Sequence, residues 1–156
     1  MPRLLRVISL DPDLGDVRRL RDCLSRLDGW RVSVQRLSKA RDVIDRLPKM
    51  RADVLFIDED LERATGVETI RALRTAGEMR PIVATAASDC GYLAADLVLA
   101  GADGYLAKAD LSPEMVGRVL GRALLHARGR TASDRLRRSA VRRMFAERGE
   151  AFTGLE

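Results

Sequence analysis

Residues 53–58 read Asp-Val-Leu-Phe-Ile-Asp, and this stretch decides the fold. Its four central residues are apolar without interruption, which is typical of a strand that is covered on both faces, as in a parallel sheet. An acidic residue, Asp58, ends the run. We therefore predict a central, buried strand over 53–58 whose last side chain is a carboxylate.

Further short apolar runs lie on either side of this stretch, and amphipathic segments separate them. The other predicted strands are residues 4–10, 31–36, 81–85 and 103–107. In the intervening segments apolar residues recur at helical spacing, as in Val17, Leu20 and Leu24. Alternating strands and helices predict an α/β fold with a five-stranded, parallel, doubly wound sheet of the flavodoxin-like type. Ser112 and Pro113 mark the start of the last of these helices.

The length of 156 residues suits one domain with an appendage. We place the domain at 1–127 and a basic, amphipathic, helical extension at 128–156, with its helix capped at Thr131 and ending near Gly149. The whole chain carries a net charge of +5, and the extension, with eight Arg against four acidic residues, carries +4 of it. The domain itself is therefore nearly neutral.

The composition also predicts where the protein works. No stretch approaches the roughly 20 apolar residues that a membrane span needs, so we expect no such span. The N-terminus reads as a strand rather than a secretion signal, and two cysteines do not make a disulfide framework. We expect a cytoplasmic protein.

Polar residues end the predicted strands. They are Asp11 and Asp13 around Pro12, then Asp58 and Asp60, then Thr85 with Ala86 after it, and finally Lys108. In a doubly wound sheet these ends converge on one edge, where ligands bind. Carboxylates suit Mg²⁺, a lysine suits phosphate oxygens, and a carboxylate can also act as a nucleophile. Taken singly, each acidic residue could equally be a solvated loop position or a helix cap, and Asp13 in particular precedes a helix.

Two segments resemble the response-regulator receiver family (CheY-like) over residues 3 to about 126. The first is Asp53-Val-Leu-Phe-Ile-Asp58-Glu-Asp-Leu-Glu-Arg-Ala-Thr-Gly66, and the second is Ala100-Gly-Ala-Asp-Gly-Tyr-Leu-Ala-Lys108. The resemblance implies that Asp58 is the phosphoacceptor, that Lys108 contacts the phosphoryl group and that Tyr105 is a rotamer switch. It also implies a bacterial two-component system, with a sensor histidine kinase or a phosphotransfer protein as donor.

The resemblance further implies a magnesium site, formed by Asp11, Asp13, Asp58 and the backbone carbonyl of Asp60. This chain departs from the family pattern because Pro12 interrupts the acidic pair, which predicts weak Mg²⁺ binding. Counting back from Lys108 places Ala86 at the position of the family's hydroxyl switch residue, with Thr85 one residue early. Successive strand residues point to opposite faces, so either Thr85 or Ala86 remains the candidate for this position. Ala109 replaces the proline that usually follows the lysine.

We favour a phosphorylated receiver domain because both Asp58 and Lys108 are present. It would signal through the face formed by its fourth helix, fifth strand and fifth helix, and it would not turn over an external substrate. An alternative is a pseudo-receiver that acts only through protein contacts. A remote alternative is a phosphatase with an Asp nucleophile, since Asp58 and Asp60 form an Asp-x-Asp pair. For the extension we expect packing on the domain or a homodimer, and no nucleic-acid binding.

Overall fold

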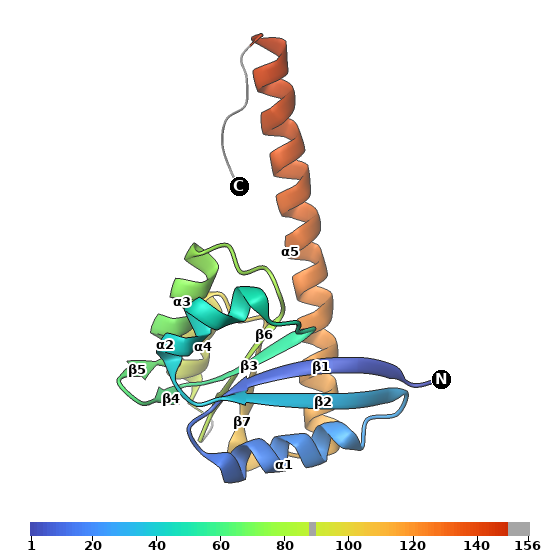
Figure 1. The fold of residues 1–156 in the computed structure, drawn as a ribbon, viewed down its shortest axis with the longest axis vertical. Coiled ribbons are helices and arrows are strands. Elements are labelled where there is room, and N and C mark those ends of the chain that lie inside the picture. The colour runs from blue at the N-terminus through green and yellow to red at the C-terminus, as the bar shows by residue number, and fades with distance from the viewer. Residues whose placement is uncertain (88–89, 150–156) are drawn as a thin grey trace.

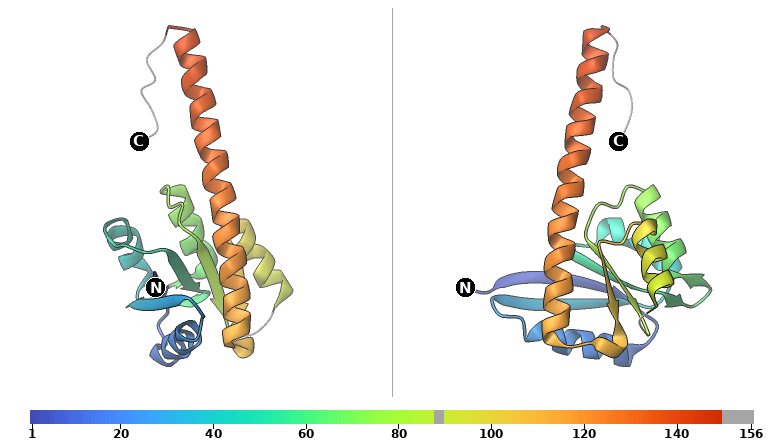
Figure 2. Two further views of the ribbon diagram at one scale, coloured as in Figure 1. Left: turned by 90° about the vertical axis from the view of Figure 1, so that its right-hand side faces the viewer. Right: turned by 180° about the vertical axis from the view of Figure 1, so that it is seen from behind.

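The computed structural model describes residues 1–87 and 90–149 (Figure 1). A parallel sheet forms the centre, helices cover both of its faces, and the last helix extends far beyond it (Figures 1 and 2). The order of the strands in the sheet is β2-β1-β3-β6-β7. These strands are β1 (Arg3–Leu10), β2 (Trp30–Leu37), β3 (Val54–Asp58), β6 (Ile82–Ala86) and β7 (Gly104–Ala107).

The five predicted strands are confirmed, each to within one residue at either end. Strand β3 is central, and all five of its residues are buried. The reason is visible in its alternation: Val54 and Phe56 join the core on one face, while Leu55 and Ile57 join the core on the other. A strand with a core on each side has no solvent-facing position, which explains its unbroken apolar sequence.

Among the described residues, two helices cover one face of the sheet and three cover the other. The first layer holds α1 (Leu14–Ser25) and the start of α5 (Pro113–Glu147); the second holds α2 (Ala40–Arg46), α3 (Gly66–Thr75) and α4 (Gly91–Ala100). Helices on both faces bury both sides of the parallel strands and leave the strand ends open as the place for a site.

Several short elements were not predicted. An antiparallel hairpin of β4 (Asp60–Leu61) and β5 (Ala64–Thr65) follows β3, and Arg63 in its turn has a φ of 63°. Single 3-10 turns, η1 (Leu47–Lys49) and η2 (Lys108–Asp110), follow α2 and β7. Elements of two or three residues are too short to show a periodicity, so a sequence pattern does not reveal them.

The C-terminal extension is helical, as predicted, but it is not a separate helix. Helix α5 runs without a break from Pro113, and the amide of Met115 donates to the Ser112 hydroxyl at 3.1 Å, so the predicted start is confirmed. The predicted cap at Thr131 is wrong. Its hydroxyl donates to the carbonyl oxygen of Ala127 at 3.0 Å, inside the helix, because nothing between 113 and 131 stops helical hydrogen bonding. The helix ends at Glu147, close to the predicted end.

Candidate functional site

The carboxyl ends of four strands meet at one edge of the sheet and bring the predicted polar residues together. Asp11 directly follows β1, Asp58 ends β3, Thr85 lies in β6 and Lys108 directly follows β7. Asp58 and Thr85 are register partners in the parallel pairing of β3 with β6. Residues up to ninety-seven positions apart in the chain thus become neighbours through the strand order alone.

The Asp58 carboxylate is buried, with only 5% of the residue exposed. Its Oδ1 accepts a hydrogen bond from the Thr85 hydroxyl at 3.0 Å and lies 3.0 Å from the ammonium nitrogen of Lys108. Its Oδ2 accepts from the backbone amide of Asp60 at 3.2 Å. A buried carboxylate needs such partners, because desolvation otherwise disfavours its charge.

Thr85, rather than Ala86, contacts Asp58. The direct register of Asp58 with Thr85 places both side chains on the same side of the sheet, whereas Ala86 is paired with Ala107 at the end of the sheet. The pairing of β3 with β6 therefore places the hydroxyl of Thr85 beside Asp58.

Lys108 lies at the centre of three carboxylates. Its Nζ is 2.8 Å from Asp11, 2.8 Å from Asp16 and 3.0 Å from Asp58. Burial opposes the charge on Lys108, but the hydrogen bonds to these carboxylates outweigh it and raise the pKa of the ammonium group. The protonated, cationic form of Lys108 is accordingly favoured among the three carboxyl groups.

Asp11 is the most deeply buried acid of the site, with 4% of the residue exposed. Burial raises the pKa of its carboxyl group, although contacts with Lys108 and the amide of Asp13 oppose this rise. Its Oδ1 accepts from the Asp13 amide at 2.8 Å, which leaves Oδ2 to meet Lys108.

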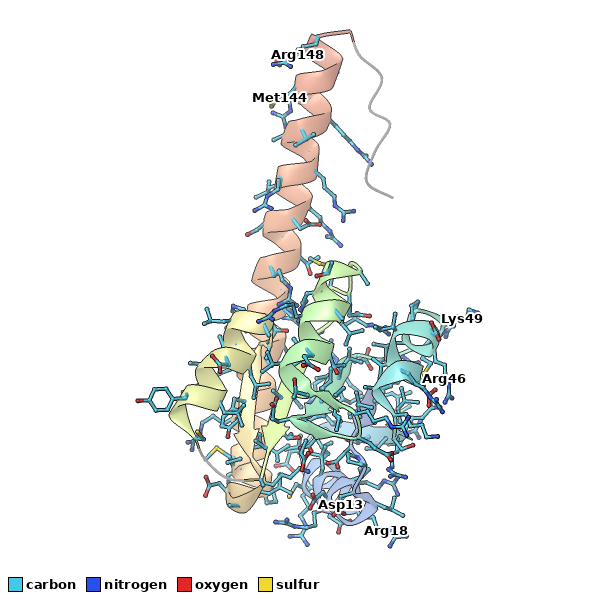
Figure 3. All side chains as sticks on the ribbon, turned by 90° about the vertical axis from the view of Figure 1, so that its left-hand side faces the viewer. Asp13, Arg18, Arg46, Lys49, Met144 and Arg148 are labelled. Carbon is cyan, nitrogen blue, oxygen red and sulfur yellow. The ribbon has the colours of Figure 1, made fainter. Side chains whose placement is uncertain are left out.

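The structure does not bring the Asp13 side chain into this cluster. Asp13 is the N-cap of α1: its Oδ1 accepts from the amide of Asp16 at 3.1 Å, and the residue is exposed at the end of the molecule (Figure 3). Asp16, in the first turn of α1, reaches Lys108 instead. Asp16 was not among the predicted site residues, because a single acid in a first helical turn looks like an ordinary favourable charge at a helix N-terminus.

The structure also places the glycine and the aromatic residue of the two motif segments, Gly66 and Tyr105. A Cβ on Gly66 would lie 2.8 Å from the carbonyl oxygen of Asp58 and 2.8 Å from the Cα of Glu59, so the start of α3 approaches the end of β3 too closely for a side chain. Tyr105 lies in β7, half-buried, and packs against the core beneath α2, α3 and α4.

The residues present fit a magnesium ion. Asp11 and Asp58 both lie within 3.0 Å of the same nitrogen atom and so offer neighbouring carboxylate oxygens. Mg²⁺ is usually held by one or two carboxylates and keeps several waters. Over residues 1–87 and 90–149, no group of three or more His, Cys, Asp or Glu side chains is arranged so that it could hold a metal ion. Asp11 and Asp58 are thus two candidate carboxylate ligands rather than a complete set.

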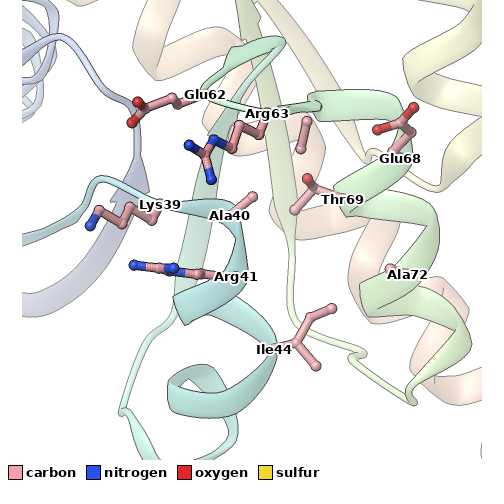
Figure 4. Close-up of a pocket in the computed structure, with 10 residues that line it drawn as sticks. Lys39, Ala40, Arg41, Ile44, Glu62, Arg63, Glu68, Thr69 and Ala72 are labelled. Carbon is pink, nitrogen blue, oxygen red and sulfur yellow. The ribbon is translucent and has the colours of Figure 1, made fainter.

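A small cavity of about 10 Å³ lies beside Lys108 and is bordered by Asp11, Asp16 and Thr85. A larger hollow of about 530 Å³ lies between α2 and α3, beside the β4–β5 hairpin, and Lys39, Arg41 and Arg63 line it (Figure 4). None of the predicted site residues lines that hollow.

The comparison with known families identifies the class of protein. Residues 11–119 match the family model described as the response regulator receiver domain, and the chain belongs to this family. It is the receiver domain of a two-component response regulator. Such domains are signalling proteins rather than classical enzymes, generally bind Mg²⁺, and interact with histidine kinases and phosphotransfer proteins.

Relatives in sequence are themselves response regulators. "Response regulator MprA" of Mycobacterium leprae is 31% identical over 121 residues, which are 78% of this chain and 51% of that protein. "Nitrate/nitrite response regulator protein NarP" of Escherichia coli is 32% identical over 93 residues, 60% of this chain and 43% of that protein. The chain thus spans about half the length of the curated relatives it matches.

Solved structures agree on the fold. A putative response regulator from Chloroflexus aurantiacus has a TM-score of 0.69 at 20% identity, covering 80% of this chain and 99% of that one. Chemotaxis response regulator CheY4 of Vibrio cholerae has a TM-score of 0.63 at 22% identity, covering 77% and 98%. None of the described helices is both long and apolar enough to cross a membrane.

Proposed function

We propose that Asp58 is the phosphoacceptor of this receiver domain. The observation that carries the proposal is the set of contacts around one carboxylate: Asp58 is buried at a strand end with the Lys108 ammonium and the Thr85 hydroxyl each 3.0 Å from its Oδ1. A carboxylate held against a fixed cation and a hydroxyl donor is suited to receive a phosphoryl group, whose oxygens need the same partners.

In the proposed transfer, a carboxylate oxygen of Asp58 attacks the phosphorus of a phosphohistidine on a sensor histidine kinase or a phosphotransfer protein. The new bond is P–O, the bond that breaks is P–N, and the imidazole leaves with the electron pair and takes up a proton. Lys108 neutralises the charge on the phosphoryl oxygens, as is usual where phosphoryl transfer depends on positioning and electrostatics. The product is an acyl phosphate on Asp58.

Asp11, Asp58 and the backbone carbonyl of Asp60 would hold Mg²⁺, which supplies positive charge for the phosphoryl oxygens when it is bound. We assign Asp11 rather than Asp13 to this role, because the Asp13 carboxylate caps α1. With one acid of the pair turned away, weak Mg²⁺ binding remains our expectation.

Phosphorylation adds roughly −1.5 to −2 charge and three acceptor oxygens beside Thr85. We propose that Thr85 follows these oxygens, that Tyr105 changes rotamer, and that the face of α4, β7 and α5 changes its partners. Exposed apolar side chains on α4 support this face as a docking surface, since Tyr92 is 88% and Leu99 is 83% exposed. Phosphotransfer from a kinase would take place in the cytoplasm.

Three observations favour the pseudo-receiver as a second candidate. Pro12 lacks a carboxylate, Asp13 serves as a cap, and Lys108 already satisfies the acids that a metal and a phosphoryl group would share. A domain in this state would signal through protein contacts alone. The phosphatase alternative has weaker support, because the Asp60 side chain that would act as general acid lies exposed on the hairpin.

The test is the mass of the protein after incubation with acetyl phosphate and Mg²⁺. We expect one phosphoryl group on the wild type and none on Asp58→Asn, while Asp60→Asn, the neighbouring acid, still accepts one because only the backbone of Asp60 contacts Asp58. An unmodified wild type with intact fold would establish the pseudo-receiver, and steady release of phosphate from a generic phosphate ester would establish the phosphatase.

For the organisation of the chain we propose a receiver domain over 1–127 and an extension over 128–156 that pairs with a second copy. The outer part of α5 leaves the domain (Figure 3), and its Leu136 and Met144 are 72% and 53% exposed. Large apolar side chains on an unpacked helix are typical of helix pairing.

A further inference from the structure

Asp16 makes one of the three ion pairs of Lys108, although the receiver motif quoted above does not include it. Its Oδ2 lies 2.8 Å from the Lys108 nitrogen, as close as Asp11 and closer than Asp58. Asp16 stands in the first turn of α1, and Lys108 is separated from it by 92 positions in the chain. The contact therefore links α1 to the end of β7.

Arg19, one turn further along α1, holds the same lysine at its backbone. The Nη2 of Arg19 donates to the carbonyl oxygen of Lys108 at 3.2 Å, and its Nη1 lies 3.7 Å from Asp16. Helix α1 thus holds Lys108 at the ammonium group and at the residue where η2 begins. Two contacts on one residue fix both its position and its orientation.

These contacts compete with a phosphoryl group for the same ammonium. An ammonium group has three N–H donors, and three carboxylates take them. Lys108 can donate to phosphoryl oxygens only after it gives up at least one of these contacts.

Among the three acids, Asp16 loses Lys108 at the lowest cost. Its side chain is 27% exposed, against 6% for Asp11 and 6% for Asp58, so water can solvate it when the lysine leaves. A buried carboxylate stripped of its cation is far more costly than a partly exposed one.

We propose that Asp16 is a positioning residue that holds Lys108 against α1 while Asp58 is unmodified and releases it when Asp58 carries a phosphoryl group. This inference rests on the proposed phosphorylation of Asp58. It makes the first turn of α1 a second region, besides the face of α4, β7 and α5, that senses the state of the site.

The test measures how tightly the full chain binds beryllofluoride, an anionic mimic of the phosphoryl group, in the presence of Mg²⁺ by calorimetry. Asp16→Asn removes the competing charge, so we expect binding to tighten by roughly 3- to 10-fold. Asp16→Glu keeps a carboxylate in the same turn and should remain close to the wild type. Asp22→Asn is the matched control, because it removes one exposed acid from the same helix, away from Lys108.

Amide hydrogen exchange over residues 14–20 supplies a second readout, which does not depend on measuring the affinity for the mimic. We expect exchange of this turn to rise in the wild type when beryllofluoride binds, and to be raised already in unliganded Asp16→Asn. Equal tightening in Asp16→Asn and Asp22→Asn, or none in either, would overturn the inference while leaving the proposed function intact. A wild type that neither binds beryllofluoride nor gains phosphoryl mass would overturn both.

Discussion

At the residue scale, Gly66 is a position next to the site that has no room for a side chain. A Cβ there would meet backbone atoms of Asp58 and Glu59 at 2.8 Å, and backbone cannot move aside as a flexible side chain can. We expect Gly66→Ala to lower the free energy of unfolding by about 1–3 kcal/mol, as overpacking does. Urea denaturation measures this change.

Gly121 in α5 is the matched control for Gly66, because nothing lies within 4 Å of a Cβ built on it. There the same substitution should raise stability by about 0.5–1 kcal/mol through helix propensity. A Gly66→Ala protein as stable as Gly121→Ala would show that the end of β3 and the start of α3 do not pack as closely as described.

At the scale of elements, Asp103 attaches helix α5 to the sheet. Its fully buried carboxylate meets Arg74 at 2.8 Å, Nδ1 of His126 at 2.6 Å and the guanidinium of Arg130. Arg130 also donates to the carbonyl oxygen of Met79 at 2.8 Å. Burial alone would raise the pKa of Asp103, but hydrogen bonds from Arg130, His126 and the Ile82 amide outweigh it and hold this pKa below its usual range.

We therefore expect Arg130→Met to lower the free energy of unfolding by about 1–3 kcal/mol, because Arg74 still compensates part of the buried charge. A depressed carboxyl pKa stabilises the fold above the unfolded value of 3.8, and this stabilisation is lost as the pH falls through the folded pKa. The difference between wild type and variant should accordingly stay constant from pH 7 to about pH 5 and shrink only below about pH 4.

Arg138→Met is the control for Arg130→Met. It breaks an exposed i,i+4 pair with Asp134, for which measured contributions are about 0.3–0.5 kcal/mol. Urea denaturation of both variants at several pH values checks the expectation, and similar losses in both would mean that Asp103 does not anchor α5.

Some elements and site residues could be predicted from the sequence, and others could not. The strand at β3 was predictable because burial on two faces leaves a continuous apolar run, and the start of α5 because Ser112 and Pro113 favour helix initiation. Which of Thr85 and Ala86 contacts Asp58 depends on how β3 pairs with β6. The sequence of one strand alone does not determine this pairing. Asp16 escaped notice because its partner, Lys108, is distant in the chain.

At the scale of the whole molecule, the exposed outer part of α5 is the surface through which we propose that two copies pair. We expect the apparent mass of the full chain in sedimentation to rise with concentration, and Leu136→Glu, which places a charge at a residue 72% exposed, to keep it monomeric. Arg138→Gln changes the net charge equally, lies on the opposite side of the helix and should still associate. A wild type that stays monomeric at every concentration would contradict pairing through α5.

Because α5 is one unbroken helix from Pro113 to Glu147, the turns that pack against the sheet and the far tip of the molecule belong to a single stiff rod. The part from Arg130 to Glu147 is about 25 Å long at the rise of an α-helix, so tilting it by about 10° carries its tip roughly 4 Å. Movements too small to alter the domain's own surface are thereby magnified at a distance, as at the end of a lever.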